Sequence, residues 1–160
     1  MNNLFAIDPG LTGAIAHFRN GELVRVVDMP VIDGRVDGRQ VTDFIIANIT
    51  GDRTIVVETP SVRPGESATS AFRAGENYGR IIQAVSYWPL EHMRPQDWSK
   101  IVRRPAKLAR QERKAWSRRR AIELWPDHAH LFTRVKDDGR AEAALIGCAH
   151  LIRTRMGAAA

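Results

Sequence analysis

Two apolar segments of the sequence each end in a carboxylate, a placement that suits chemistry with a metal ion. Asp8 ends the run 4–7 and precedes a Pro-Gly turn, and Glu58 ends the run 54–57 of β-branched residues. Both runs have the composition of buried strands. A carboxylate at the end of such a strand is held where its oxygens can face a cation instead of being lost in solvent.

Two further acids lie near the end of the chain, four residues apart. Asp138 and Glu142 are about 40° from one another around an α-helix and point the same way, whereas Asp137 is about 140° from Glu142. We therefore expect Asp138 and Glu142 to reach the site, and Asp137 to cap the helix or contact solvent. Glu142 borders the apolar stripe that should pack on a sheet, which consists of Ala141, Leu145, Cys148 and Ile152.

Four carboxylates held close together repel one another, and divalent cations resolve that conflict. Carboxylate oxygens are hard ligands that suit Mg²⁺ or Mn²⁺ and not zinc. Two such ions about 4 Å apart can activate a water and stabilise the leaving oxygen of a phosphodiester. Taken singly, these acids are better explained as a helix cap, a solvated helix charge or a surface acid. Together they predict a site for two Mg²⁺ ions, with Mn²⁺ as a substitute, formed by Asp8, Glu58, Asp138 and Glu142.

The segment 8–12 has another possible meaning, because Asp-x-Gly-x-Thr between two strands also holds phosphate in actin-like and sugar-kinase folds. Those ATPases close two domains on their nucleotide, whereas 160 residues form one domain of ordinary size. The single Cys148 excludes an internal disulfide framework and a multi-cysteine zinc site. The sequence shows no signal peptide and no run of the roughly 20 apolar residues that a membrane span needs. We therefore expect a cytoplasmic protein, or one of the host cytoplasm if a phage encodes it.

Positive charge is concentrated in one segment. Residues 94–120 contain eleven Lys and Arg against two acids, a local charge of +9, so the other residues sum to −3 within a total of +6. A basic segment on a slightly acidic body is typical of a protein that binds a polyanion, most often nucleic acid. A solvated helix face is the alternative. The residues that we expect to contact DNA are Lys100, Arg103, Arg104, Lys107, Arg110, Lys114 and Arg118.

Hydrophobic periodicity and turn signals predict a mixed α/β architecture. The expected strands are 3–8, 13–18, 22–28, 54–58 and 90–93, the helices are 40–49, 67–87, 95–102, 109–124 and 138–155, and the loops are 30–39 and 61–66. The third strand of a meander lies at an edge, which leaves the first strand free to pair with the fourth, in the order 3-2-1-4-5. Asp8 and Glu58 would then lie side by side. The chain forms a single domain, 1–156, followed by a short tail, 157–160.

Three motifs, in this order, resemble those of the RuvC-type Holliday junction resolvases, which belong to the RNase H-like nucleases. They are Ile7-Asp8-Pro9-Gly10-x-x-Gly13, Val56-Val57-Glu58 and Asp138-Gly-Arg-Ala-Glu142-Ala-Ala-Leu-Ile. The first motif is moderately specific, and all three in order are strong. The similarity covers nearly the whole chain, and residues 71–80 resemble the helix that lies beside the dimer interface of that family.

This resemblance implies an RNase H-like fold, with a mixed five-stranded sheet flanked by helices, and a crossover junction endodeoxyribonuclease that resolves four-way junctions with two Mg²⁺ ions. By the same resemblance, the four acids are the catalytic metal ligands, and Lys100 and Lys114 contact phosphate of the scissile strand. A homodimer is also implied, because a four-way junction has two-fold symmetry and its resolution requires paired symmetric cuts.

The spacing of the last motif departs from the bacterial pattern. Bacterial members usually end with two aspartates three apart, whereas Asp138 and Glu142 are four apart, as in phage-type relatives, so the chain fits a phage or prophage origin. A nuclease for other branched DNA, such as flaps or replication forks, is the nearest alternative. A non-catalytic junction-binding protein is a second one, which the complete set of four acids disfavours. Phe72 or the loop around Arg63 could contact bases at the junction centre, although Phe72 fits a helical core face equally well.

Overall fold

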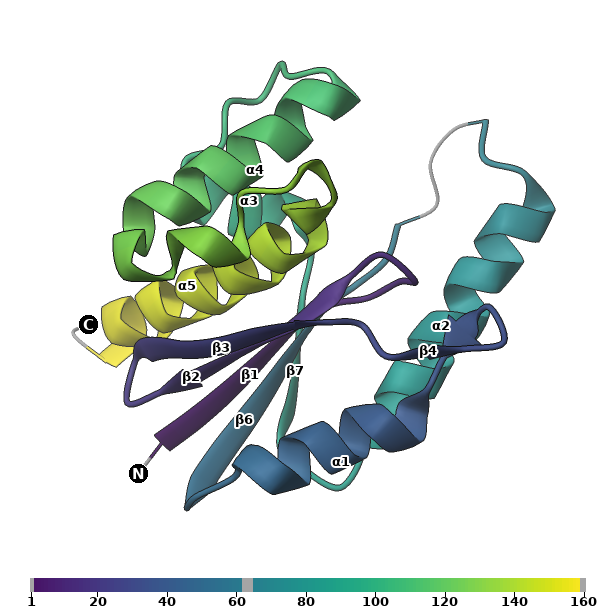
Figure 1. Cartoon of the computed structure of the whole chain (residues 1–160), viewed down its shortest axis with the longest axis horizontal. Coiled ribbons are helices and arrows are strands. Elements are labelled where there is room, and N and C mark those ends of the chain that lie inside the picture. The colour runs from purple at the N-terminus through teal and green to yellow at the C-terminus, as the bar shows by residue number, and fades with distance from the viewer. Residues whose placement is uncertain (1, 62–64, 159–160) are drawn as a thin grey trace.

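A five-stranded mixed sheet forms the centre of the protein. The structure is a computed structural model that describes residues 2–61 and 65–158 (Figure 1). The strands of the sheet are β1 (Asn2–Asp8), β2 (Ala14–Arg19), β3 (Glu22–Asp28), β6 (Asp52–Glu58) and β7 (Leu90–Met93). They lie in the order β3-β2-β1-β6-β7. The first three are antiparallel neighbours, whereas β6 is parallel to both β1 and β7. The predicted fold class and strand order are confirmed.

A small hairpin occupies most of the segment that was predicted to be a loop, 30–39. Its strands are β4 (Val31–Ile32) and β5 (Arg35–Val36). The turn between them is Asp33-Gly34, and both residues have positive φ, 50° and 70°. A tight hairpin turn of this kind requires positive φ at both positions, which Asp-Gly adopts readily. The loop prediction was therefore wrong, because the Asp-Gly signal lies between strands too short to show an alternating pattern.

Helices cover both faces of the sheet, as Figure 1 shows. On one side lie α1 (Gly38–Asn48) and α2 (Ala68–Val85), and on the other lie α3 (Pro95–Ile101), α4 (Arg110–Leu124) and α5 (Asp138–Ala158). Two short 3₁₀ segments, η1 (Pro126–Leu131) and η2 (Val135–Asp137), connect α4 to α5. Among the described helices, none combines the length and the apolar composition that are needed to cross a bilayer.

The sheet separates two hydrophobic cores. Along β1, Leu4 and Ala6 belong to the core under α3, α4 and α5, while Phe5 and Ile7 belong to the core under α1 and α2. This alternation follows from the two-residue period of a strand. A strand that is buried on both faces reads as a continuous apolar run, which explains why the runs that precede Asp8 and Glu58 could be identified in the sequence.

The last helix is buried more widely than one stripe. It packs against the sheet and against α4, and its buried residues include Ala141, Ala143, Ala144, Leu145, Ile146 and Ala149. The predicted stripe was correct for its first two members. It was wrong for Cys148, which is only partly buried, and for Ile152, which is 37% exposed. Helix α4 covers a second side of α5. Small residues such as Ala143 and Ala144, which lie outside the predicted stripe, are therefore buried as well.

Candidate active site

Two of the four predicted site acids lie next to each other at one edge of the sheet. Ile7 of β1 pairs with Val57 of β6, and the two strands are parallel. The residues that follow this pair are Asp8 and Glu58, so both carboxylates leave the sheet at its carboxyl-terminal edge. The edge at which parallel strands end is where α/β folds commonly place functional side chains.

The start of α5 brings the other two acids to the same edge. A Cβ built on Gly139 would stand 2.2 Å from the backbone oxygen of Thr12, so only glycine allows α5 to approach the turn after β1 this closely. Gly13 is under the same constraint, since its Cβ would stand 2.0 Å from the backbone oxygen of Asp8. Close backbone contacts therefore explain Gly13 of the first motif and Gly139 of the third.

All four acids line one cleft of about 1110 Å³. Burial, followed by the charges of Glu142, Glu58 and Asp138, raises the pKa of Asp8 well above its ordinary value of 3.8. The pKa of Glu142 is also raised, first by burial and further by Asp138, although Arg104 and Ser117 oppose the shift. The cluster is therefore electrostatically unfavourable to the protein when no cation is bound.

Glu58, Asp138 and Glu142 each have a polar or charged partner from α3, from α4 or from the turn that follows α3. Glu58 Oε1 accepts a hydrogen bond of 2.6 Å from the indole nitrogen of Trp98. Asp138 Oδ2 lies 2.5 Å from Nζ of Lys114. Glu142 Oε1 accepts a hydrogen bond of 3.2 Å from Ser117 Oγ. Nη1 of Arg104 lies 3.7 Å from the same oxygen and forms an ion pair with it.

Two of these partners were not predicted. Trp98 was expected only to pack, and Ser117 was not singled out. A buried indole N–H almost always finds an acceptor, so Trp98, three residues after the helix-starting Pro95, carried a usable signal. Ser117 carried none, because its role depends on how α4 meets α5.

The chemistry of the four acids fits a hard divalent cation. All the donors are carboxylate oxygens, and a cation would relieve the repulsion that raises the pKa of Asp8. Among the residues that the structure describes, however, no three His, Cys, Asp or Glu side chains stand in an arrangement that could hold a metal ion. Asp138 is paired with Lys114, so a cation bound by Asp138 would have to displace that ammonium group.

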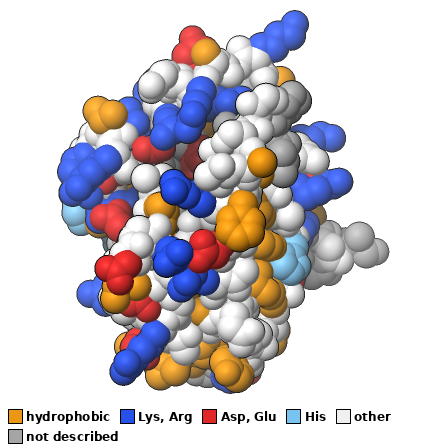
Figure 2. Space-filling view, turned by 90° about the vertical axis from the view of Figure 1, so that its right-hand side faces the viewer, with side chains coloured by type: hydrophobic (Ala, Val, Ile, Leu, Met, Phe, Trp, Pro, Cys, Tyr) orange, Lys and Arg blue, Asp and Glu red, His pale blue; other side chains and the backbone are white. Residues whose placement is uncertain are grey.

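The basic segment divides into residues that line the cleft and residues that do not. Of the seven predicted DNA contacts, four line it: Lys100, Arg104, Arg110 and Lys114. Arg113 lines it too and was not among the seven. Arg118 instead donates a hydrogen bond of 2.9 Å to the backbone oxygen of Val135. Figure 2 shows Lys and Arg side chains around acidic ones in the upper half of the molecule.

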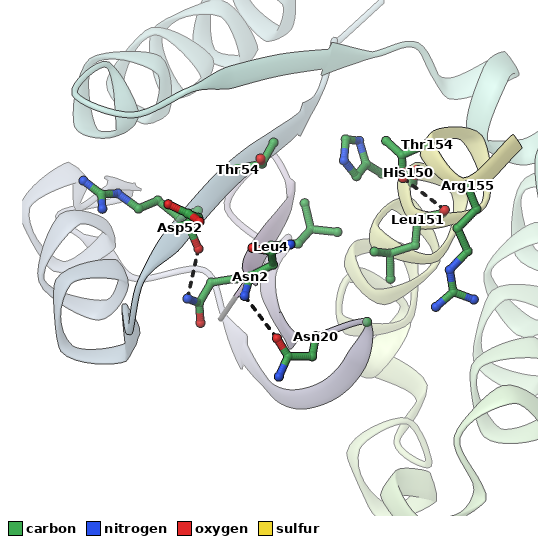
Figure 3. Close-up of a pocket in the computed structure, with 12 residues that line it drawn as sticks. Asn2, Leu4, Asn20, Asp52, Thr54, His150, Leu151, Thr154 and Arg155 are labelled. Atoms are coloured by element: carbon green, nitrogen blue, oxygen red, sulfur yellow. Dashed lines mark hydrogen bonds between the residues drawn. The ribbon is translucent and has the colours of Figure 1, made fainter. Parts of the chain in front are cut away.

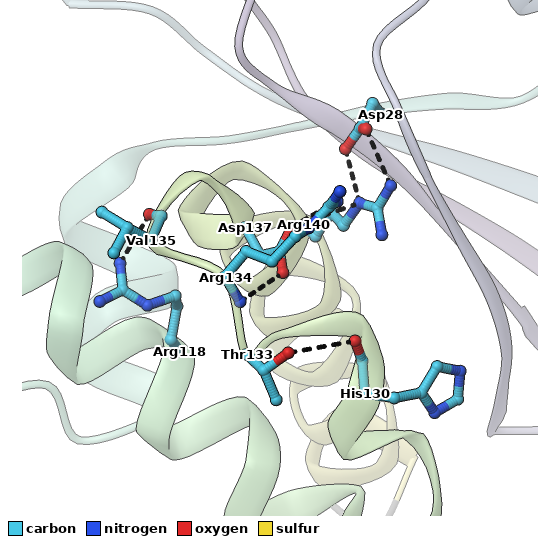
Figure 4. Close-up of polar contacts among 8 residues, drawn as sticks. All are labelled: Asp28, Arg118, His130, Thr133, Arg134, Val135, Asp137 and Arg140. Carbon is cyan, nitrogen blue, oxygen red and sulfur yellow. Dashed lines mark hydrogen bonds and ion pairs between the residues drawn. The ribbon is translucent and has the colours of Figure 1, made fainter.

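Asp137 neither caps the last helix nor contacts solvent, so that expectation was wrong. The residue is fully buried, and its carboxylate accepts hydrogen bonds from the backbone and guanidinium nitrogens of Arg134, at 2.7 to 2.9 Å (Figure 4). Arg140 lies beside it, 3.9 Å away, and makes two hydrogen bonds to Asp28 of β3. Asp137 points away from the cleft as the spacing predicted, but into a second polar network.

A smaller pocket of about 530 Å³ lies at the amino-terminal end of β1 and β6 (Figure 3). Its lining includes Asn2, Asp52, His150 and Arg155, and it shares no lining residue with the cleft. Burial lowers the pKa of His150. The backbone nitrogen of Asn2 donates a hydrogen bond to the side-chain oxygen of Asn20. None of the predicted site residues lies in this pocket.

The comparisons with known proteins concern the fold of the chain. No protein-family model matches the sequence, and no curated protein does. Among solved structures, the chain is similar to Thermus thermophilus RuvC in complex with a Holliday junction substrate. The TM-score is 0.69 at 15% sequence identity, over 98% of this chain and 97% of that chain. A second Thermus thermophilus RuvC structure gives a TM-score of 0.59 at 18% identity, over 97% and 96% of the two chains.

The chain has a RuvC-type fold. The likeness extends over nearly the full length of both proteins, so it includes the strand ends and the start of the last helix, where the acids lie. On this RuvC-type fold, the lining of the cleft combines four carboxylates with five Lys and Arg side chains. Carboxylates can hold a divalent cation, and Lys and Arg can bind the phosphates of a polyanion.

Phe72 and the loop around Arg63 were predicted to contact bases at the junction centre. Phe72 lies on α2 with 74% of its surface exposed, so it does not belong to a core face and is free to contact another molecule. Arg63 lies outside the described residues.

Proposed function

We propose that this protein is a metal-dependent, structure-selective DNA endonuclease that resolves four-way junctions by paired symmetric cuts. The observation that carries the proposal is that four carboxylates and five Lys and Arg side chains line the same cleft. The RuvC-type fold supports it, since one of the similar structures holds a Holliday junction substrate.

In this proposal, Asp8, Glu58, Asp138 and Glu142 hold two Mg²⁺ ions, for which Mn²⁺ can substitute. When bound, the ions supply an activated water and stabilise the leaving oxygen of the phosphodiester. Burial and three acidic neighbours together raise the pKa of Asp8. A bound cation would stabilise its charged form, so Asp8 is the first choice for substitution.

The basic residues of the cleft position the DNA backbone. Lys100 and Arg110 line the cleft with exposed side chains, so they are accessible to a phosphate of the DNA backbone. Lys114 pairs with Asp138, and a cation bound to Asp138 would compete with this pair. Release of Asp138 frees its ammonium group for a phosphate of the scissile strand, so binding of the cation and of DNA favour each other.

We propose that the outer face of α2 forms the homodimer interface. Besides Phe72, this face carries Gly75 and Gly79, and a Cβ built on either glycine meets nothing within 4 Å. Small residues four apart let two helices approach closely. Gly79→Leu should lower the dimer fraction in sedimentation experiments without loss of monomer stability, because it adds a better helix former in open space. Gly157→Leu, equally open on α5, is the matched control.

The function is tested with a labelled four-way junction, incubated with protein and Mg²⁺ beside linear duplex and flap substrates. We expect two symmetric nicks in the junction, none in the duplex, and no cleavage with a chelator or with Asp8→Asn. Asp43→Asn, an exposed acid on the far side of the sheet, should cleave normally. Faster cleavage of flaps would favour the alternative of a nuclease for other branched DNA. Tight junction binding without any cleavage would favour a non-catalytic junction-binding protein.

A further inference from the structure

Trp98 is placed by the fold to control one acid of the cleft. It is the largest fully buried side chain, with only 1% of its surface exposed. Its indole nitrogen therefore depends on a protein acceptor, and that acceptor is Glu58 Oε1 at 2.6 Å. A hydrogen bond from a rigid, buried ring to a carboxylate restricts the orientation of the carboxylate.

Arg104 connects the same indole to a second acid. Its guanidinium carbon lies 4.5 Å from the centroid of the Trp98 ring, and its Nη1 lies 3.7 Å from Oε1 of Glu142. Only 15% of the side chain is exposed, although its charge would be better solvated outside the protein. Stacking on an aromatic face holds the plane of a guanidinium in a way that a lysine cannot reproduce.

The turn before Arg104 is a Schellman-type ending of α3, with Arg103 as the left-handed residue after the helix. Arg103 has φ of 61°, which a residue with a side chain rarely adopts, and the backbone nitrogen of Arg104 bonds to the oxygen of Ser99 at 2.8 Å. This turn ends α3 and returns the chain over Trp98. Glycine is the usual residue at this left-handed position after a helix, and here the turn brings Arg104 back onto the Trp98 ring.

We infer that Trp98 and Arg104 are positioning residues that together set Glu58 and Glu142 for cation binding. The inference rests on the proposed function. It assigns Arg104 a role distinct from phosphate contact, and it gives the cleft a support for its acids that none of the sequence motifs contains. Partners that orient metal-binding side chains typically change metal affinity about 10–100-fold when they are removed.

The first test follows the four indole N–H signals of the ¹⁵N-labelled, metal-free protein by NMR. The Trp98 signal is identified by its loss in Trp98→Phe. We expect it to move in Glu58→Gln and in Arg104→Lys, while the signals of Trp88 and Trp125 stay in place. A Trp98 signal that does not respond to Glu58→Gln would overturn the inference whether or not the protein cleaves DNA. This measurement leaves Trp98 intact in the informative variants.

The second test measures Mn²⁺ affinity by calorimetry. Trp98→Phe should bind Mn²⁺ about 10–100-fold more weakly than the wild type, whereas Trp88→Phe, which removes an indole on the other face of the sheet, should bind within about two-fold. Arg104→Lys keeps the positive charge, so a purely electrostatic role predicts no change in affinity, while a positioning role predicts a loss of about ten-fold.

The measurements distinguish a failure of the positioning role from a failure of the proposed function. If the wild type binds Mn²⁺ and both Trp98→Phe and Arg104→Lys bind it equally well, the positioning role is wrong and the proposed function stands. If the folded wild type binds no divalent cation, the proposed function is wrong, and the positioning role falls with it even where the NMR contact is present.

Discussion

Two groups of acids meet at the start of α5, and adjacent residues in the chain belong to different groups. Asp138 faces the cleft with Asp8, Glu58 and Glu142. Asp137 lies in a second network, with Asp28, in which the partners are the guanidinium groups of Arg134 and Arg140 (Figure 4). Both clusters contain carboxylates, but the pKa of Asp8 in the cleft is raised and that of Asp137 in the second network is lowered.

The pKa values describe this contrast. Burial and like charges raise the pKa of Asp8. In the second network, the hydrogen bond from Arg140 lowers the pKa of Asp28. Burial acts to raise that of Asp137, but the hydrogen bonds and charge of Arg134 outweigh it and the pKa falls. The second network thus stabilises the fold by itself, whereas the charged forms of Asp8 and Glu142 in the cleft are disfavoured. A group of acids that is retained against stability points to function.

The largest expected effect is on cleavage. Asp8→Asn, Asp138→Asn and Glu142→Gln are nearly isosteric, so they change charge and ligation more than shape. Each should lower the single-turnover cleavage rate more than about 100-fold, beyond the range seen when only a supporting partner is removed. Junction affinity, measured by anisotropy, should stay within about three-fold, since phosphate contacts come from other residues. Asp8→Asn that cleaves at the wild-type rate would rule out the metal site.

The adjacent substitution should affect stability instead. Asp137→Asn removes an acceptor of charged hydrogen bonds and should lower the free energy of unfolding by about 1–2 kcal/mol, the lower part of the usual range, because Arg134 is half exposed. Urea unfolding measures this decrease, with Asp138→Asn as the neighbouring control. The folded Asp137→Asn protein should cleave within about ten-fold of the wild type. If Asp137→Asn is inactive and Asp138→Asn is active, the two roles are exchanged.

The pH dependence of stability should separate the two networks in the metal-free protein. The raised pKa of Asp8 means that its contribution is complete below the ordinary value of 3.8 and is lost as pH rises through the folded-state pKa. Asp8→Asn should therefore have a higher melting temperature than the wild type at neutral pH, by about 2–4 °C for each kcal/mol of added stability. The difference should vanish in acid. Asp137 has a lowered pKa, so its stabilisation is present above 3.8 and lost as pH falls further. Parallel pH profiles for the two variants would contradict the contrast.

The smallest effect concerns the Lys and Arg side chains that line the cleft. Replacing Lys100 and Lys114 together with Ala should flatten the slope of log affinity against log salt by about 1.8, which is about 0.9 for each phosphate that the protein no longer neutralises, and should slow cleavage. Arg39→Ala with Arg53→Ala removes two exposed charges outside the cleft and should leave the slope unchanged. An unaltered slope in the lysine variant would identify the segment as a solvated surface.

Much of the fold could be predicted from local patterns. Strands buried on both faces are continuous apolar runs, so the positions of Asp8 and Glu58 at strand ends were visible in the sequence. The last helix begins at Asp138, as predicted, and continues to Ala158, beyond the expected 155. The hairpin at 31–36 was missed because its strands are two residues long and carry no period.

The sequence by itself determined which acids share a face, because a helix has a fixed angle for each residue. Asp138 and Glu142 therefore reach the cleft together, and Asp137 does not. Only the tertiary structure decided what each acid meets there. Trp98, Ser117 and Lys114 come from α3 and α4, and their approach depends on how those helices pack on α5. Hydrogen bonds between distant segments follow from packing, and no local period encodes it.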